Sequence, residues 1–174
     1  MKLMFIASAI AMTMAAGTAM ASHGEIKFFG NVTAQTCDLV PEIGGAINNM
    51  VQLGTVTTKG DGTTHEGKAI NFVLKAKDAT ACVKAGELGA VITWDGNLGT
   101  EGVVNQGGMA TDAYVVLLAK NAQSANTKIT SSQNSATFDK SKLAGEGYEF
   151  SAQLIGGTNP GDFRSASAYV VTYK

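Results

Sequence analysis

Two histidines are the side chains of this sequence that most readily suggest catalysis. His23 lies near the start of the chain, and His65 lies in the polar run Thr63-Thr64-His65-Glu66-Gly67. Hydrolytic or redox chemistry needs a nucleophile, a base and an orienting group, or a metal with several ligands. Neither histidine has partners at such spacing, and no G-x-S-x-G, H-E-x-x-H or Walker-type motif occurs. We therefore expect no catalytic residues, no metal site, no cofactor and no enzymatic activity.

Two other side chains have the chemistry to contact a sugar. Trp94, in Val91-Ile92-Thr93-Trp94-Asp95-Gly96, is either an exposed stacking platform or an aromatic residue at a strand end that covers the core. Arg164, beside Asp162, is the candidate cation for an acidic glycan. The formal net charge of the chain is only −1. This balance argues against nucleic acid as a partner.

The first 21 residues have the pattern of a secretory signal peptide. Lys2 precedes an apolar run from Leu3 to about Ala16, and small residues stand at Ala19 and Ala21. This pattern predicts cleavage after Ala21 and export of residues 22–174 as one domain. A membrane anchor is the alternative, but the apolar run is shorter than the roughly 20 residues that span a bilayer.

Export places the two cysteines, Cys37 and Cys82, in an oxidising compartment, where a disulfide between them is expected. Two free thiols or a metal pair are the alternatives. Because the two residues lack CxxC spacing, they form neither a redox motif nor a zinc site.

The elements that must position these residues are predicted to be β-strands. Short apolar runs are separated by turn signals such as Asp61-Gly62, Asp95-Gly96-Asn97 and Asn159-Pro160-Gly161. About seven short strands with one cysteine pair indicate an all-β, immunoglobulin-like sandwich. The polar run Asn121 to Asn134 is expected to be a surface excursion, with Ile129 as its apolar anchor and a short strand at Thr127 to Thr130, and a receptor-contacting loop is the alternative. The candidate strands are Gly24 to Leu39, Met50 to Thr57, Ala69 to Lys75, Ala90 to Trp94, Ala113 to Lys120, Tyr148 to Ile155 and Ser165 to Tyr173.

The stretch from Gly24 to Val32 alternates apolar or small residues with mostly polar ones. An extended chain would place five of its residues on one face: Gly24, Ile26, Phe28, Gly30 and Val32. Only Phe29 breaks the alternation on the opposite face. The pattern predicts a strand, and it fits a strand of the chain's own domain as well as one donated to a neighbour.

The chain resembles the structural pilin subunits of chaperone-usher fimbriae, the class that includes type 1 major subunits, and most closely the major subunits of enterotoxigenic fimbriae. The resemblance covers residues 22–174. It rests on the alternating stretch from Gly24 to Val32, followed by Cys37, and on four further groups of residues in order: Val51-x-Leu53-Gly54, Phe72-x-Leu74 leading to Cys82, Tyr148-x-Phe150-x-Ala152-x-Leu154, and Ala168-Tyr169-Val170-Val171-Thr172-Tyr173-Lys174.

This resemblance implies an incomplete immunoglobulin-like β-sandwich, the pilin fold, which a donor strand completes. Residues 22–33 would be the N-terminal donor-strand extension and residues 34–174 the pilin domain. Ile26, Phe28 and Val32 would enter a neighbour's groove, while Gly24 would fit where the groove is shallow. Copies of the chain or other fimbrial subunits, a periplasmic chaperone and an outer-membrane usher are the implied partners. The groove-edge strand that the chaperone would grasp carries Tyr169, Val171, Tyr173 and Lys174.

The resemblance predicts a structural shaft subunit that is exported through the periplasm to a fimbrium on the cell surface and supports adhesion to host cells. A subunit that itself binds host glycans as an adhesin is the alternative. A secreted enzyme is a third reading, which the sparse inventory of acids, bases and nucleophiles disfavours.

Overall fold

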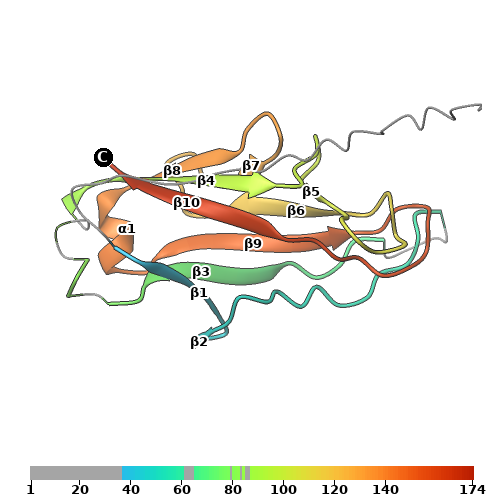
Figure 1. Ribbon diagram of the computed structural model, residues 1–174, viewed down its shortest axis with the longest axis horizontal. Helices are drawn as coiled ribbons and strands as arrows, with labels where there is room; N and C mark the ends of the chain where they lie inside the picture. Colours follow the sequence, from blue (N-terminus) through green and yellow to red (C-terminus); the bar gives the residue numbers. More distant parts are fainter. Residues whose placement is uncertain (1–36, 61–64, 79, 83, 85–86) are drawn as a thin grey trace, which may run out of the picture.

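The two facing β-sheets of this protein are unequal in size (Figure 1). The structure is a computed structural model that describes residues 37–60, 65–78, 80–82, 84 and 87–174. The predicted signal peptide and the donor-strand extension at residues 22–33 lie outside the described residues. The described chain is almost entirely β, as the sequence predicted.

One sheet has seven strands in the order β2-β1-β3-β9-β6-β5, with β7 also paired to β6, and the other has three in the order β10-β4-β8. Every pairing between these strands is antiparallel. In chain order the elements are β1 (Leu39–Ile43), β2 (Ala46–Ile47), β3 (Ile70–Ala76), β4 (Ala90–Gly96), β5 (Val103–Val104), β6 (Tyr114–Ala119), β7 (Thr127–Ile129), β8 (Ser135–Phe138), α1 (Lys140–Ala144), β9 (Tyr148–Ile155) and β10 (Ser167–Tyr173).

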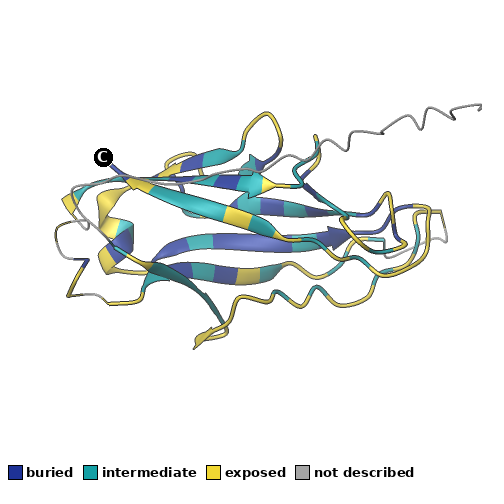
Figure 2. Ribbon diagram, in the orientation of Figure 1, coloured by how far each residue is buried: buried dark blue, intermediate teal, exposed yellow. Residues whose placement is uncertain are grey.

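The core lies between the two sheets and is built around a cluster of aromatic rings. Phe150 on β9 stacks on Phe72 of β3 at 5.5 Å between ring centroids and meets the edge of Trp94 of β4 at 5.2 Å. Phe138 of β8 lies 5.5 Å from Phe150 and 4.9 Å from Tyr148. Figure 2 shows β9 buried along most of its length, as expected for a strand with neighbours on both sides. Rings from both sheets therefore share one core.

Five of the predicted strands are confirmed within one or two residues at each end. They correspond to β3, β4, β6, β9 and β10, and β9 has the predicted bounds. In β4 and β6 buried and partly buried residues alternate, so the period of two that predicted them reflects true sheet faces. The expected short strand at Thr127 to Thr130 is found as β7, and its anchor Ile129 is fully buried.

The predicted strand from Met50 to Thr57 is wrong. Residues 50–57 are extended chain without strand pairing to any described residue, although Val51, Leu53 and Val56 are less exposed than their neighbours. Gly54 has φ +77°, which breaks a regular strand after Leu53. The apolar residues of this run therefore indicated which side chains are partly buried, while strand pairing also requires a neighbouring edge.

Five small elements were not predicted from the sequence. The hairpin of β1 and β2 turns at Gly44 and Gly45, which have φ of +60° and +85°. Strand β5 has two residues, β8 follows the polar excursion directly, and α1 is a single short helix. These segments are too short for periodicity to reveal them.

The predicted disulfide is confirmed: Cys37 and Cys82 are bonded, and their Cα atoms are 4.9 Å apart. The bond ties the chain just before β1 to the loop that follows β3. Cys82 itself is buried against the core.

Replacing both cysteines by alanine should lower the free energy of unfolding by about 4 kcal/mol, because the bond closes a loop with a sequence separation of 45 residues. Urea unfolding of the oxidised protein and of the double variant measures this difference. Equal midpoints and slopes for the two proteins would contradict the prediction.

Candidate strand-binding groove

Strand β10 forms one edge of the smaller sheet. Its seven residues pair in continuous register with β4, from Ser167 opposite Gly96 to Tyr173 opposite Ala90. No other described strand pairs with β10. Residues 48–58 run along the same side of the sandwich without strand pairing (Figure 1). The two sheets are therefore not closed onto each other along this side.

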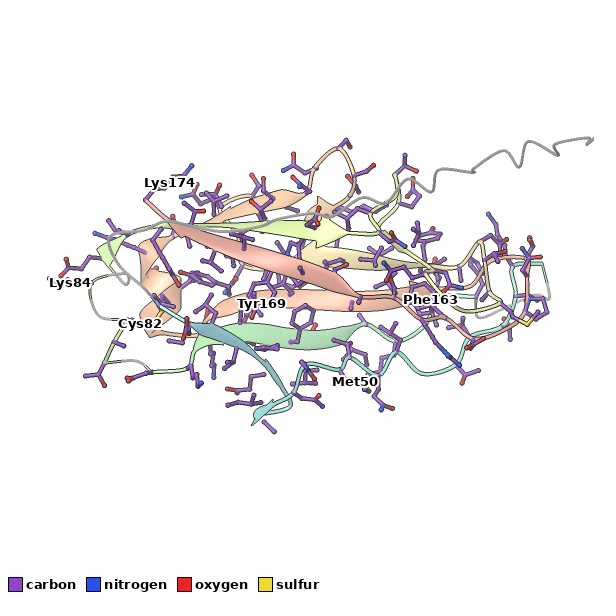
Figure 3. The ribbon with its side chains drawn as sticks, viewed as in Figure 1. Met50, Cys82, Lys84, Phe163, Tyr169 and Lys174 are labelled. Carbon is purple, nitrogen blue, oxygen red and sulfur yellow. A yellow bond between two sulfur atoms is a disulfide. The ribbon has the colours of Figure 1, made fainter. Side chains whose placement is uncertain are left out.

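A cavity of about 510 Å³ opens along this side and reaches the core. Its floor is apolar and comes from both sheets, with Phe72, Leu74, Leu117 and Trp94 among its residues. One rim is formed by residues 48–51 and 53, and the other by residues 163, 165–167 and 169. Figure 3 shows Tyr169, Phe163 and Met50 on the elements that border this opening. Core side chains thus line a groove instead of being covered by a strand.

A second cavity of about 710 Å³ continues the first. The two share Val51, Leu53 and Phe163, so we treat them as one groove. The second part extends along residues 54–58 to the loop of residues 156–157 and 159–163. The groove therefore runs from Tyr169 past the N-terminal end of β10.

Two tyrosines of β10 link this strand to the start of β1. The Tyr169 hydroxyl donates to the carbonyl oxygen of Leu39 at 3.0 Å, and the Tyr173 hydroxyl donates to that of Cys37 at 3.3 Å. Burial raises the pKa of Tyr169, and burial together with the charge of Asp38 raises the pKa of Tyr173 to about 12. Both hydroxyls remain protonated at neutral pH and can donate these bonds. The links place Cys37 beside the C-terminal end of β10.

A hydrogen-bonded pair of loops builds the far end of the groove. The Asn105 amide nitrogen donates to the carbonyl oxygens of Gly108 and Ala110 at 2.9 Å, and its oxygen accepts from the N–H of Arg164 at 3.0 Å. Asp112 accepts from the hydroxyl and N–H of Thr158, both at 2.6 Å. These bonds fix the loop of residues 156–163 that lines the groove.

The two candidate glycan residues lie in different environments. Trp94 is 6% exposed and is surrounded by Phe72, Phe150 and Tyr169, which favours its role in the core over a sugar platform at the surface. The side chain of Arg164 is 75% exposed and forms an ion pair with Asp162 at 2.7 Å. The structure therefore does not display the two as one exposed sugar site.

The groove-edge residues predicted from the sequence lie on β10 or directly after it, as Figure 3 shows for Tyr169 and Lys174. The predicted donor residues Gly24, Ile26, Phe28, Gly30 and Val32 fall outside the described residues. The contribution of residues 48–58 to the groove was missed, because residues 50–57 were interpreted as a paired strand.

Comparison with known proteins relates the whole chain to fimbrial proteins. The F107 fimbrial protein of Escherichia coli is 45% identical over 175 residues, covering 100% of both chains. The K99 fimbrial protein of Escherichia coli is 30% identical over 176 residues, covering 93% of each. The chain belongs to the fimbrial proteins. No protein-family model matches this fimbrial protein.

As a fimbrial subunit, the protein is exported to a surface fimbrium and assembles with other fimbrial subunits, and its relatives imply a structural role without enzymatic activity. Within the described part of the chain, no group of three or more His, Cys, Asp or Glu residues is placed to hold a metal ion. No helix of the described residues has the length and apolarity to cross a membrane.

The Asp112 bonds make the stability of the groove end depend on pH. Hydrogen bonds from the Thr158 hydroxyl, and from the N–H groups of Thr158 and Asn159, hold the pKa of the Asp112 carboxyl far below its usual value. A carboxyl with a depressed folded-state pKa stabilises the fold above its unfolded pKa of about 3.9, and this contribution is lost as the pH falls. Replacing Asp112 by Asn should therefore lower the melting temperature at pH 7, and the difference from wild type should shrink between about pH 4 and pH 2. A difference that stays constant over this range would contradict the assignment.

Proposed function

We propose that this fimbrial protein is a shaft subunit that polymerises by donor-strand exchange, with residues 22–33 of one subunit completing the sandwich of another. The observation that carries the proposal is the groove beside β10, where core residues of both sheets line an open cavity. An exposed sheet edge beside exposed core surface is a site for β-strand addition. Backbone hydrogen bonds to β10 would supply affinity, and alternate side chains would set the register.

The alternating stretch has the chemistry to fill such a groove. Ile26, Phe28 and Val32 would each bury an apolar side chain, worth on the order of 1.5 to 3 kcal/mol apiece before the entropy of ordering is subtracted. Phe28 would join the rings of Phe72, Trp94 and Tyr169, which line the cavity. Gly24 and Gly30 would allow close approach of the backbones.

The position of Cys37 favours a strand from a second copy. An antiparallel strand on β10 begins at its C-terminal end, near Tyr173, and from Gly24 to Val32 it extends about 26 Å toward the loop end of the groove. Five residue steps separate Val32 from Cys37 and span at most about 18 Å. Because Cys37 lies at the Tyr173 end, the same chain cannot easily return to it. This distance supports antiparallel completion by a strand from a second copy.

Export would follow the pathway that the resemblance implies. After removal of residues 1–21, a periplasmic chaperone would occupy the groove and hold the C-terminal residues Tyr173 and Lys174. An outer-membrane usher would then allow the extension of the next subunit to replace the chaperone. A sheet edge without a partner strand, beside an open groove lined by core residues such as Phe72 and Trp94, would otherwise promote aggregation, which is the physical reason for a chaperone.

A self-complemented variant tests the proposal. Residues 22–33 are deleted from their native position and placed after Lys174 through a flexible linker, so that the strand folds back along β10 as a hairpin. This variant should be a soluble monomer that is more stable than the chain lacking residues 22–33. Thermal melting and size-exclusion chromatography measure both properties. A deletion variant that is already monomeric and as stable as the fusion would show that the groove is not completed by a donated strand, and would contradict the proposal.

Two substitutions in the fused strand provide a matched pair. Phe28→Asp places a charge on the face directed into the groove and should undo most of the gain in stability. Phe29→Asp places the same charge on the opposite face and should leave most of the gain intact. In the full chain, Phe28→Asp should block polymerisation and spare chaperone binding, because donation and acceptance use different surfaces. Equal effects of the two substitutions in the melting assay would contradict the assignment of faces.

Adhesion to host cells is proposed as a property of the fibre. The exposed Arg164 is the described residue that best fits an acidic host glycan, and a single shallow surface contact binds weakly. Many copies along a fibre would raise the effective affinity through multivalency. Fibres should therefore bind glycan arrays or host cells while monomers do not. Tight glycan binding by a soluble monomer would instead support the adhesin alternative.

A further inference from the structure

Three polar side-chain atoms on the wall of the groove are buried without a hydrogen-bond partner among the described residues. They are the indole nitrogen of Trp94 and the hydroxyl oxygens of Ser165 and Ser167. All three residues line the 510 Å³ cavity. The fourth atom of this kind, the hydroxyl of Tyr148, belongs to a residue that does not line it. The unpaired atoms are thus concentrated where the core is open.

These residues lie close together at the N-terminal half of β10. Tyr169 pairs with Trp94 across the smaller sheet, and Ser167, two residues earlier on the same face of β10, pairs with Gly96. The Trp94 ring meets Phe72 and Phe150 edge to face, so core packing holds its orientation. The indole nitrogen and the two hydroxyls therefore belong to a preformed part of the wall.

Neighbouring polar groups in the same region are paired. The Tyr169 hydroxyl donates to Leu39, and the carbonyl oxygen of Trp94 accepts from the Asn134 amide at 3.1 Å. Buried polar groups in folded proteins nearly always have a partner, and leaving one unpaired is unfavourable. Three unpaired atoms in one open groove indicate that the partner belongs to the occupant of the groove.

We propose that Trp94, Ser165 and Ser167 form a polar receptor that hydrogen-bonds the backbone of the incoming strand at Gly30. This inference rests on the proposed donor-strand exchange. An antiparallel strand with Gly24 opposite Tyr173 has Gly30 opposite Ser167, since the two strands run in opposite directions. Without a side chain at Gly30, the incoming backbone can approach the wall closely.

The chemistry of the receptor matches a peptide backbone. The indole N–H is a donor only and requires a carbonyl oxygen, whereas a serine hydroxyl can donate to a carbonyl or accept from an N–H. A side chain larger than hydrogen at position 30 would hold the backbone away from all three groups. The receptor therefore specifies a glycine in the occupant and its register on β10, a task that the apolar floor alone performs poorly.

The test compares free subunits and polymers of the full chain. In the double variant Ser165→Ala with Ser167→Ala, the free subunit should melt at the wild-type temperature or above, because two unpaired hydroxyls are removed. Its polymers should dissociate at a lower temperature than wild-type polymers, as followed by heating in detergent and electrophoresis. The free variant should also bind a synthetic peptide of residues 22–33 about 10-fold more weakly, as expected for the loss of two hydrogen bonds.

Two further variants separate this role from packing. Ser141→Ala, an exposed serine on α1, is the control and should change neither measurement. Ser167→Thr retains a hydroxyl and should restore part of the peptide affinity lost in Ser167→Ala. If polymers of the double variant were as stable as wild-type polymers, or if subunit and polymer were destabilised equally, the receptor would be overturned. Donor-strand exchange would still stand. A wild-type chain that neither polymerises nor binds the peptide would overturn both.

Discussion

The inequality of the two sheets is the constraint on which the rest of this structure depends. A sandwich is stable when each sheet covers the apolar face of the other, and here three strands face seven. The rings of Phe72, Phe150 and Trp94 pack against one another. Phe72 and Trp94 nevertheless also line an open groove. The tyrosine links from β10 to β1, the unpaired polar atoms of Trp94, Ser165 and Ser167, and the extended rim of residues 48–58 all lie along that one uncovered side.

Sequence patterns predicted the strands of this fold where burial and pairing coincide. Strand β9 has neighbours on both sides, and the alternation from Tyr148 to Leu154 gave its bounds without error. Residues 50–57 also form a short apolar run, but they lie beside the open edge and pair with no described strand, which the run itself could not reveal. Alternation measures which side chains face the interior. Whether the backbone is paired depends on contacts between distant parts of the chain.

The site was predictable to a similar degree. The strand with Tyr169 and Tyr173 followed from its pattern, and the disulfide of Cys37 with Cys82 followed from the compartment. The role of that strand as a groove edge was implied by the family resemblance. The groove itself requires the arrangement of both sheets. Nothing in the residues Ser165-Ala166-Ser167 distinguishes hydroxyls with partners from hydroxyls without them. The two roles left open for Trp94 could be weighed only when its neighbours were known, and its burial favours the core.

On the proposed mechanism, the positions of groove and disulfide also determine how a fibre carries tension. Force would enter a subunit through the strand held against β10 and leave through its own Cys37, only a few residues after its donated strand. An antiparallel strand pulled along its length loads all its backbone bonds together, so none fails alone. At the other end, the bond to Cys82 anchors Cys37 beside β3, and the Tyr173 hydroxyl connects it to β10. The strand that receives the load is thus tied directly to the residue that passes it on, and the intervening loops need not carry it.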